Sequence, residues 1–135
     1  MKNHKKLAVV TGAANGIGAG LSREASRRGF RVLMADFDEA ALTKTAAEIQ
    51  DAEILVTDVS NPNAVDALAD FADSLGGTDL LFNNAGVMIP PYTKTKDGFE
   101  NTVGINHLGH FAFQHIFKRR DLVFWVSQRD IHDTI

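Results

Sequence analysis

The chain of 135 residues is long enough for one domain with a buried core, and at 44% hydrophobic and 23% charged residues it has an ordinary globular composition. Its net charge of −3 argues against nucleic acid as a main partner, and the absence of cysteine excludes disulfides and thiolate chemistry. The basic start MKNHKK is not followed by the apolar region of a signal peptide, and no apolar run approaches the ~18 residues of a membrane span, so we expect a cytoplasmic protein.

The first predicted element is a strand over 7–11, which runs into a glycine-rich turn and then a helix. The glycines have the spacing G-x-x-x-G-x-G, at Gly12, Gly16 and Gly18. This arrangement is typical of phosphate sites, because the helix start offers unpaired N–H groups and the positive end of its dipole. Glycine also permits positive φ and a close approach of the ligand to the backbone. The alternative for such a turn alone is a helix-starting loop without a ligand.

The rest of the chain alternates strands with helices of about ten to fifteen residues, which predicts βαβ units. We expect helices over about 15–28, 39–50, from Pro62 to Gly76 and over about 98–120, and strands over 31–35, 53–57 and 80–83. Segment 122–126 is either a fifth strand or an apolar tail. Right-handed crossovers give an α/β fold, a Rossmann-type doubly wound parallel sheet with strand order 3-2-1-4.

Polar side chains follow the predicted strands at the edge where such sheets bind ligands. A carboxylate at Asp36 can accept hydrogen bonds from both adenosine ribose hydroxyls and would repel a 2′-phosphate, which favours NAD over NADP; the alternative is a helix-capping Asp. Asp58 can bond the adenine amino group, or it can be a turn residue before Ser60. Asn83 and Asn84 can tie adjacent loops together through their amide groups.

In order and spacing, five motifs resemble the short-chain dehydrogenase/reductase family over roughly residues 5–117. They are TGAANGIG at Thr11–Gly18, Asp36, DV at Asp58-Val59, NNAG at Asn83–Gly86 and INHLGHF at Ile105–Phe111. The string KTKDGFE before GINHLGHF resembles the retinol-dehydrogenase-like branch in particular. The resemblance implies hydride transfer between a nicotinamide and a small alcohol or carbonyl substrate.

The resemblance also assigns roles to individual residues. It implies that the glycine turn lines the pyrophosphate, that Asp36 selects NAD, and that Asp58 and Val59 hold adenine. Asn106 matches the helix Asn that holds a water of the family's proton relay, and the helix over Asn106–Phe117 is expected to pair subunits in a homo-oligomer. The expected cofactor-binding residues are Gly12, Asn15, Gly16, Ile17, Gly18, Asp36, Asp58, Val59, Asn84, Ala85 and Gly86.

The family's catalytic Tyr and the Lys four residues after it lie beyond the fifth strand, and the sequence ends at Ile135 before they are due. Ser127 is a candidate for the substrate-orienting Ser, although that Ser usually falls at the position of Gln128. Tyr92 and Lys96 read Y-x-x-x-K but come too early in the chain. His107, His110 and His115 lack cysteine or clustered carboxylates beside them, so no metal site is expected.

Two classes of function remain open. The first is an oxidoreductase in which residues 1–135 are a single NAD(P)-binding Rossmann domain without the C-terminal catalytic half. Such a fragment, isoform or product of an interrupted reading frame would have little or no turnover. The second is a non-catalytic module that binds a dinucleotide or joins subunits. A third, an S-adenosylmethionine or other nucleotide enzyme, does not fit the glycine spacing or the Asn-Asn-Ala-Gly motif.

Overall fold

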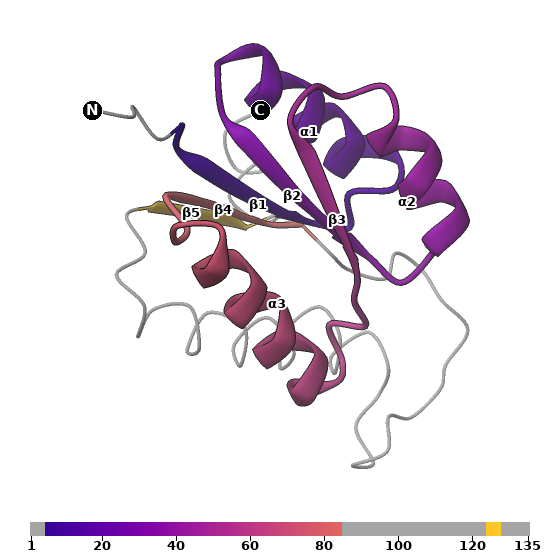
Figure 1. Ribbon diagram of the computed structural model, residues 1–135. Helices are drawn as coiled ribbons and strands as arrows, with labels where there is room; N and C mark the ends of the chain where they lie inside the picture. Colours follow the sequence, from indigo (N-terminus) through magenta and orange to yellow (C-terminus); the bar gives the residue numbers. More distant parts are fainter. Residues whose placement is uncertain (1–4, 85–123, 128–135) are drawn as a thin grey trace.

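The computed structural model describes residues 5–84 and 124–127, which form one parallel sheet with helices on both faces (Figure 1). The sheet order is β3-β2-β1-β4-β5, and every neighbouring pair is parallel. The elements are β1 (Leu7–Thr11), α1 (Gly16–Arg27), β2 (Arg31–Asp36), α2 (Glu39–Ala46), β3 (Ala52–Val56), α3 (Pro62–Ser74), β4 (Leu80–Asn83) and β5 (Phe124–Ser127). The predicted Rossmann-type order is therefore confirmed, and the segment left open as strand or tail forms β5.

Each face of the sheet packs against its own apolar layer. Alternate residues of a strand point to opposite faces, so Val9 and Leu33 join the buried cluster formed with α3, while Val10 and Met34 join the cluster on the side of α1 and α2. Figure 1 shows the same division, with α3 on one side of the sheet and α1 and α2 on the other. Because both faces are covered, the strands are nearly continuous apolar runs.

The second helix is shorter than predicted. The apolar spacing that ends at Ile49 extends the predicted helix to residue 50, but α2 ends at Ala46. Beyond it the backbone tightens into i→i+3 bonds, from Glu48 N to Thr45 O at 3.1 Å and from Ile49 N to Ala46 O at 3.0 Å. Asp51 then takes a φ of 57° at the turn into β3. Ile49 is nevertheless buried, so the helical spacing of buried residues continues past the point where the helix ends.

None of the helices in the described residues is both long and apolar enough to cross a membrane.

Candidate functional site

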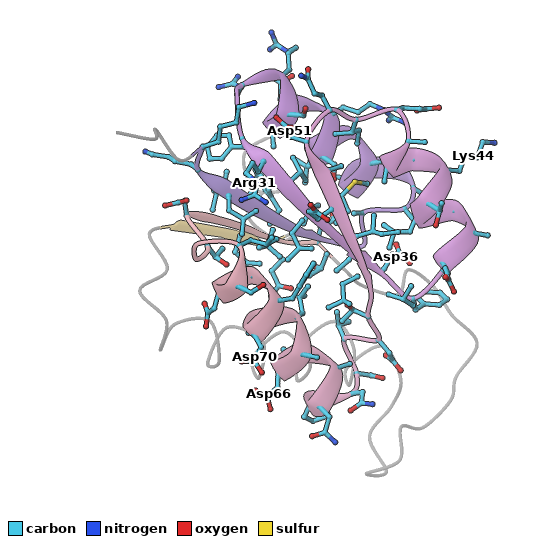
Figure 2. All side chains as sticks on the ribbon, viewed as in Figure 1. Arg31, Asp36, Lys44, Asp51, Asp66 and Asp70 are labelled. Carbon is cyan, nitrogen blue, oxygen red and sulfur yellow. The ribbon has the colours of Figure 1, made fainter. Side chains whose placement is uncertain are left out.

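The glycine-rich turn, Asp36, Asp58 and Asn84 all lie where a strand of the sheet ends. Thr11, the last residue of β1, is in register with Ala35 of β2, which is in register with Leu55 of β3. The carboxyl ends of these parallel strands therefore meet at one edge of the sheet. Asp36 is labelled at this edge in Figure 2, beside the turn that enters α2.

The three glycines of the turn are needed for two different reasons. Gly12 has a φ of 64° and Gly16 a φ of 55°, which is the left-handed region that side chains disfavour. Gly18 is helical, but a Cβ on it would lie 2.0 Å from Gly12 O and 2.8 Å from Asn84 Nδ2. The first two glycines therefore shape the turn, and the third lets the start of α1 pack against it.

The amino end of α1 is uncapped, unlike those of the other helices in the described residues. Its N-cap residue, Asn15, makes no side-chain capping hydrogen bond, and the first turn contains no acidic residue. By contrast, Asp38 caps α2 through Ala41 N, and Asn61 caps α3 through Asn63 N. The first N–H groups of α1 are thus left for an external acceptor, and no carboxylate of that turn neutralises the helix dipole. Such an end is suited to an anion.

Asp36 is bound to this turn. Its Oδ2 accepts a hydrogen bond from Ala14 N at 3.1 Å, and its Oδ1 accepts one from Asp38 N at 3.0 Å. The helix-capping role that was the alternative for Asp36 belongs to Asp38, whose Oδ1 accepts from Ala41 N at 3.1 Å. Each carboxylate oxygen can accept a further hydrogen bond, because it has two lone pairs. Asp36 is partly exposed, so this remaining capacity is open to a ligand.

Asp58 has the turn geometry that its alternative interpretation predicted. Its Oδ1 accepts from Ser60 N at 3.0 Å and from Ser60 Oγ at 2.6 Å. The side chain is exposed, whereas the next residue, Val59, packs on the cluster under α3. Asp58 therefore stabilises its own turn while its carboxylate stays at the surface of the sheet edge.

Asn84 links β4 to the glycine turn, which is the role predicted for both Asn83 and Asn84. Its backbone N–H donates to Thr11 Oγ1 at 2.9 Å, and its Nδ2 donates to Gly12 O at 3.4 Å. The Thr11 hydroxyl in turn donates to Phe82 O at 3.4 Å. Asn83 is fully buried, and its amide has no hydrogen-bond partner in the described part of the chain.

Two residues of this edge were not identified from the sequence. Phe37 follows Asp36 and is 78% exposed, which makes its ring the most exposed of the large apolar side chains in the described segments. Thr45 lies on the inner face of α2, and its hydroxyl donates to Ala14 O at 2.7 Å. A signal for Thr45 existed, because it interrupts the apolar spacing of Leu42 and Ile49 with a hydroxyl that must find a buried partner.

Several residues singled out from the sequence lie outside the described residues, and for Ser127 the backbone alone is described. Ser127 ends β5 opposite Asn83 in the strand register. Residues 5–84 contain no group of three or more side chains that could hold a metal ion. The residues outside are Ala85, Gly86, Tyr92, Lys96, Asn106, His107, His110 and His115, together with the rest of the predicted helix over about 98–120, which includes the proposed subunit-pairing segment 106–117.

Comparison with known proteins decides the family. The sequence model of the short chain dehydrogenases matches residues 6–120. The chain belongs to the short chain dehydrogenase family. This placement within a family of oxidoreductases agrees with the Rossmann-type sheet and with the glycine spacing described above.

Individual family members are similar over most of this chain. Retinol dehydrogenase 12 from Bos taurus is 41% identical over 122 residues, which cover 85% of this chain and 39% of that protein. Retinol dehydrogenase 11 from Mus musculus is 42% identical over 120 residues, covering 82% of this chain and 37% of that protein. The similarity is thus of the retinol-dehydrogenase-like type, and the chain spans well under half the length of these relatives.

Solved structures of the family share the fold. A short chain dehydrogenase/reductase from Burkholderia phymatum, crystallised in complex with NAD, matches with a TM-score of 0.75 and 30% identity. The match covers 89% of this chain and 46% of that one.

Proposed function

We propose that the edge of the sheet formed by the glycine turn and Asp36 binds a nicotinamide dinucleotide, and that it takes NAD in preference to NADP. The observation that carries this proposal is the hydrogen bond from Ala14 N to Asp36 Oδ2. It joins an acidic side chain to the same turn that presents the uncapped start of α1. The uncapped N–H groups of α1, which can bind an anion, and the Asp36 carboxylate, which can bind sugar hydroxyls, are thus joined through the same turn.

The pyrophosphate is assigned to the turn and to the first residues of α1. The uncapped N–H groups can donate to phosphate oxygens, and the absence of side chains at Gly12, Gly16 and Gly18 supports a close approach. Asn15 and Ile17 flank this start, and Ile17 is 44% exposed. An exposed apolar side chain there fits a contact with a bound cofactor better than a place in the core.

The adenosine half is assigned to the ends of β2 and β3. Asp36 accepts from the ribose hydroxyls and opposes a 2′-phosphate by charge repulsion, which is the basis of the NAD preference. Asp58 and Val59 are proposed to border the adenine. The exposed ring of Phe37 adds an aromatic face beside Asp36 on which a base can stack. Asn84 holds the floor of the site through its bond to Gly12 O, and Ala85 and Gly86 are proposed to continue it.

The bound dinucleotide would supply or accept the hydride in a family reaction on an alcohol or carbonyl. In this chain the described residues bind and orient it. We propose that residues 5–84 serve cofactor binding and supply no general acid or base of the reaction. Four further assignments remain predictions. They are Asn106 as a proton-relay residue, Ser127 as a substrate contact, a homo-oligomer through Asn106–Phe117 and a cytoplasmic location.

The cofactor preference is tested by calorimetric titration of the wild-type chain and Asp36→Asn with NADH and with NADPH. We expect the wild type to prefer NADH, and Asp36→Asn to relax that preference by about 1–3 kcal/mol, the scale of one charged hydrogen bond. The matched control is Asp58→Asn, which removes a neighbouring carboxylate and should weaken both cofactors equally. An unchanged preference in Asp36→Asn would assign the selection to another group.

The same samples separate the two function classes. Binding of NADH without oxidation of any alcohol supports a dinucleotide-binding module. Robust oxidation by the pure chain would instead support the oxidoreductase class and make Tyr92 and Lys96 candidates for its acid–base pair. The absence of any heat with either cofactor at millimolar concentrations would reject the dinucleotide site itself.

A further inference from the structure

Ala14, in the middle of the glycine turn, is held on both sides by side chains from other elements. Its N–H donates to Asp36 Oδ2 at 3.1 Å, and its carbonyl accepts from Thr45 Oγ1 at 2.7 Å. Ala14 is 1% exposed and Thr45 8%, so water competes little for the second bond. One peptide segment of the turn is thereby fixed between the end of β2 and the inner face of α2.

Thr45 has no packing reason to be polar. It is buried with Leu42 on the side of α2 that faces the sheet, where an apolar residue of similar size would fill the same space. A buried hydroxyl is costly unless it is bonded, and a helical threonine commonly bonds a carbonyl of its own preceding turn. Here the hydroxyl instead reaches out of α2 to a carbonyl 31 residues earlier in the chain.

The bonded segment lies directly before the proposed anion site. Asn15 and Gly16 follow Ala14, and Asn15 gives α1 no side-chain cap. The direction in which the first N–H groups of α1 point therefore depends on how the backbone enters the helix. Gly12 and Gly16, both at positive φ, allow the backbone before α1 to take many conformations. The hydrogen bond from Thr45 to Ala14 O, which lies between these two glycines, limits the conformations that the turn can take.

We propose that Thr45 is a positioning residue of the dinucleotide site, which holds the turn through Ala14 O so that the start of α1 is preorganised for the pyrophosphate. This inference rests on the function proposed above. It assigns part of the affinity to α2, an element that need not touch the ligand. Preorganisation raises affinity because the ordering of the turn is no longer a cost of binding.

The test uses the full chain with Thr45→Val, which keeps the shape and removes the hydroxyl, and Thr45→Ser, which keeps the hydroxyl and loses the methyl group. We expect Thr45→Val to bind NADH on the order of tenfold more weakly, as for an unsatisfied buried carbonyl, and Thr45→Ser to bind nearly as the wild type does. Thr43→Val is the matched control, because Thr43 is exposed on the same helix. Equal losses in Thr45→Val and Thr45→Ser would reduce Thr45 to a packing role and overturn the proposal.

A second measurement needs no ligand. Amide hydrogen exchange over residues 12–18 should become faster in Thr45→Val and stay unchanged in Thr45→Ser, with β1 and β2 unaffected in both. If the wild type binds no NADH, the proposed function fails, while the exchange result still tests whether the hydrogen bond from Thr45 to Ala14 O holds the turn. If the wild type binds NADH but exchange over 12–18 is unchanged, only the role of Thr45 fails.

A third measurement covers the case in which Thr45→Val does not fold. In the unmodified chain, the NMR signal of the Thr45 methyl group should shift on titration with NADH, while that of Thr43 stays in place. A Thr45 signal that does not respond while NADH binds would contradict the coupling of α2 to the site.

Discussion

At the scale of single residues, the site depends on backbone groups held by a few side chains. Thr11, Asp36 and Thr45 each bond a main-chain group of another segment, and those bonds fix the backbone of the turn and its neighbour Asn84. A sequence pattern identifies residues such as Asp36 by their position after a strand. It can indicate that the Thr45 hydroxyl needs a buried partner, but it does not identify that partner, which is set by the packing of α2 on the turn.

Gly18 gives the sharpest prediction at this scale. A Cβ there would lie 2.0 Å from Gly12 O, a backbone atom that cannot move away without opening the turn. We expect Gly18→Ala to lower the free energy of unfolding by about 1–3 kcal/mol, the usual cost of overpacking, and to abolish measurable binding of NADH. Urea denaturation and calorimetry measure the two effects.

Gly20→Ala is the matched control for this substitution. It lies in the same helix, and a Cβ at Gly20 would meet nothing within 4 Å. Because alanine favours a helix over glycine by about 1 kcal/mol, Gly20→Ala should be as stable as the wild type or more stable, with NADH binding retained. A Gly18→Ala chain that behaved like this control would show that the turn tolerates a side chain at residue 18.

At the scale of elements, the sequence predicted the existence and order of the described strands and helices well, and their ends less well. β1 and β4 match their predicted bounds, because both are short apolar runs bounded by polar or glycine residues. α2 is shorter than predicted, because the buried Ile49 continues the helical period after the helix has ended. Asp36 and Asp38 are two residues apart, and only the structure separates the one that caps α2 from the one that holds the turn.

The carboxyl end of α1 gives a prediction about pH. Glu24 accepts hydrogen bonds from Arg27 and Arg28, and these bonds, chiefly the one from Arg27, lower its pKa from an ordinary 4.5 to about 2. A carboxylate with a lower pKa in the folded chain stabilises it above pH 4.5, and that contribution is lost as the pH falls toward 2.

Glu24→Gln should therefore lose stability relative to the wild type at neutral pH, and the gap should close as the pH is lowered from 4.5 toward 2. Thermal unfolding of both chains across this range measures the difference. Glu24 and Arg27 are both exposed to solvent, so high salt should also reduce the difference in stability between the two chains at neutral pH. A gap that stayed constant across the acid range would mean that Glu24 titrates alike in the folded and unfolded chains.

At the scale of the whole molecule, the burial of the strands falls from β1 at the centre of the sheet to β3 at one edge. β1 pairs with both β2 and β4, and all five of its residues are buried. β3 pairs with β2 alone within the described residues, and its residues are half-buried or exposed, with Val56 46% exposed. Strands with few buried contacts open at lower free energy than central ones.

Hydrogen exchange on the ligand-free chain should therefore be slowest in β1, intermediate in β2 and fastest in β3. Addition of NADH should slow exchange most at residues 12–18 and leave this order unchanged, because the proposed site lies at the ends of the strands and does not cover β3. Protection of β3 equal to that of β1 would contradict this order. It would mean that the outer strand is paired with further chain, and repeating the measurement at several protein concentrations would distinguish a second copy from a segment of the same molecule.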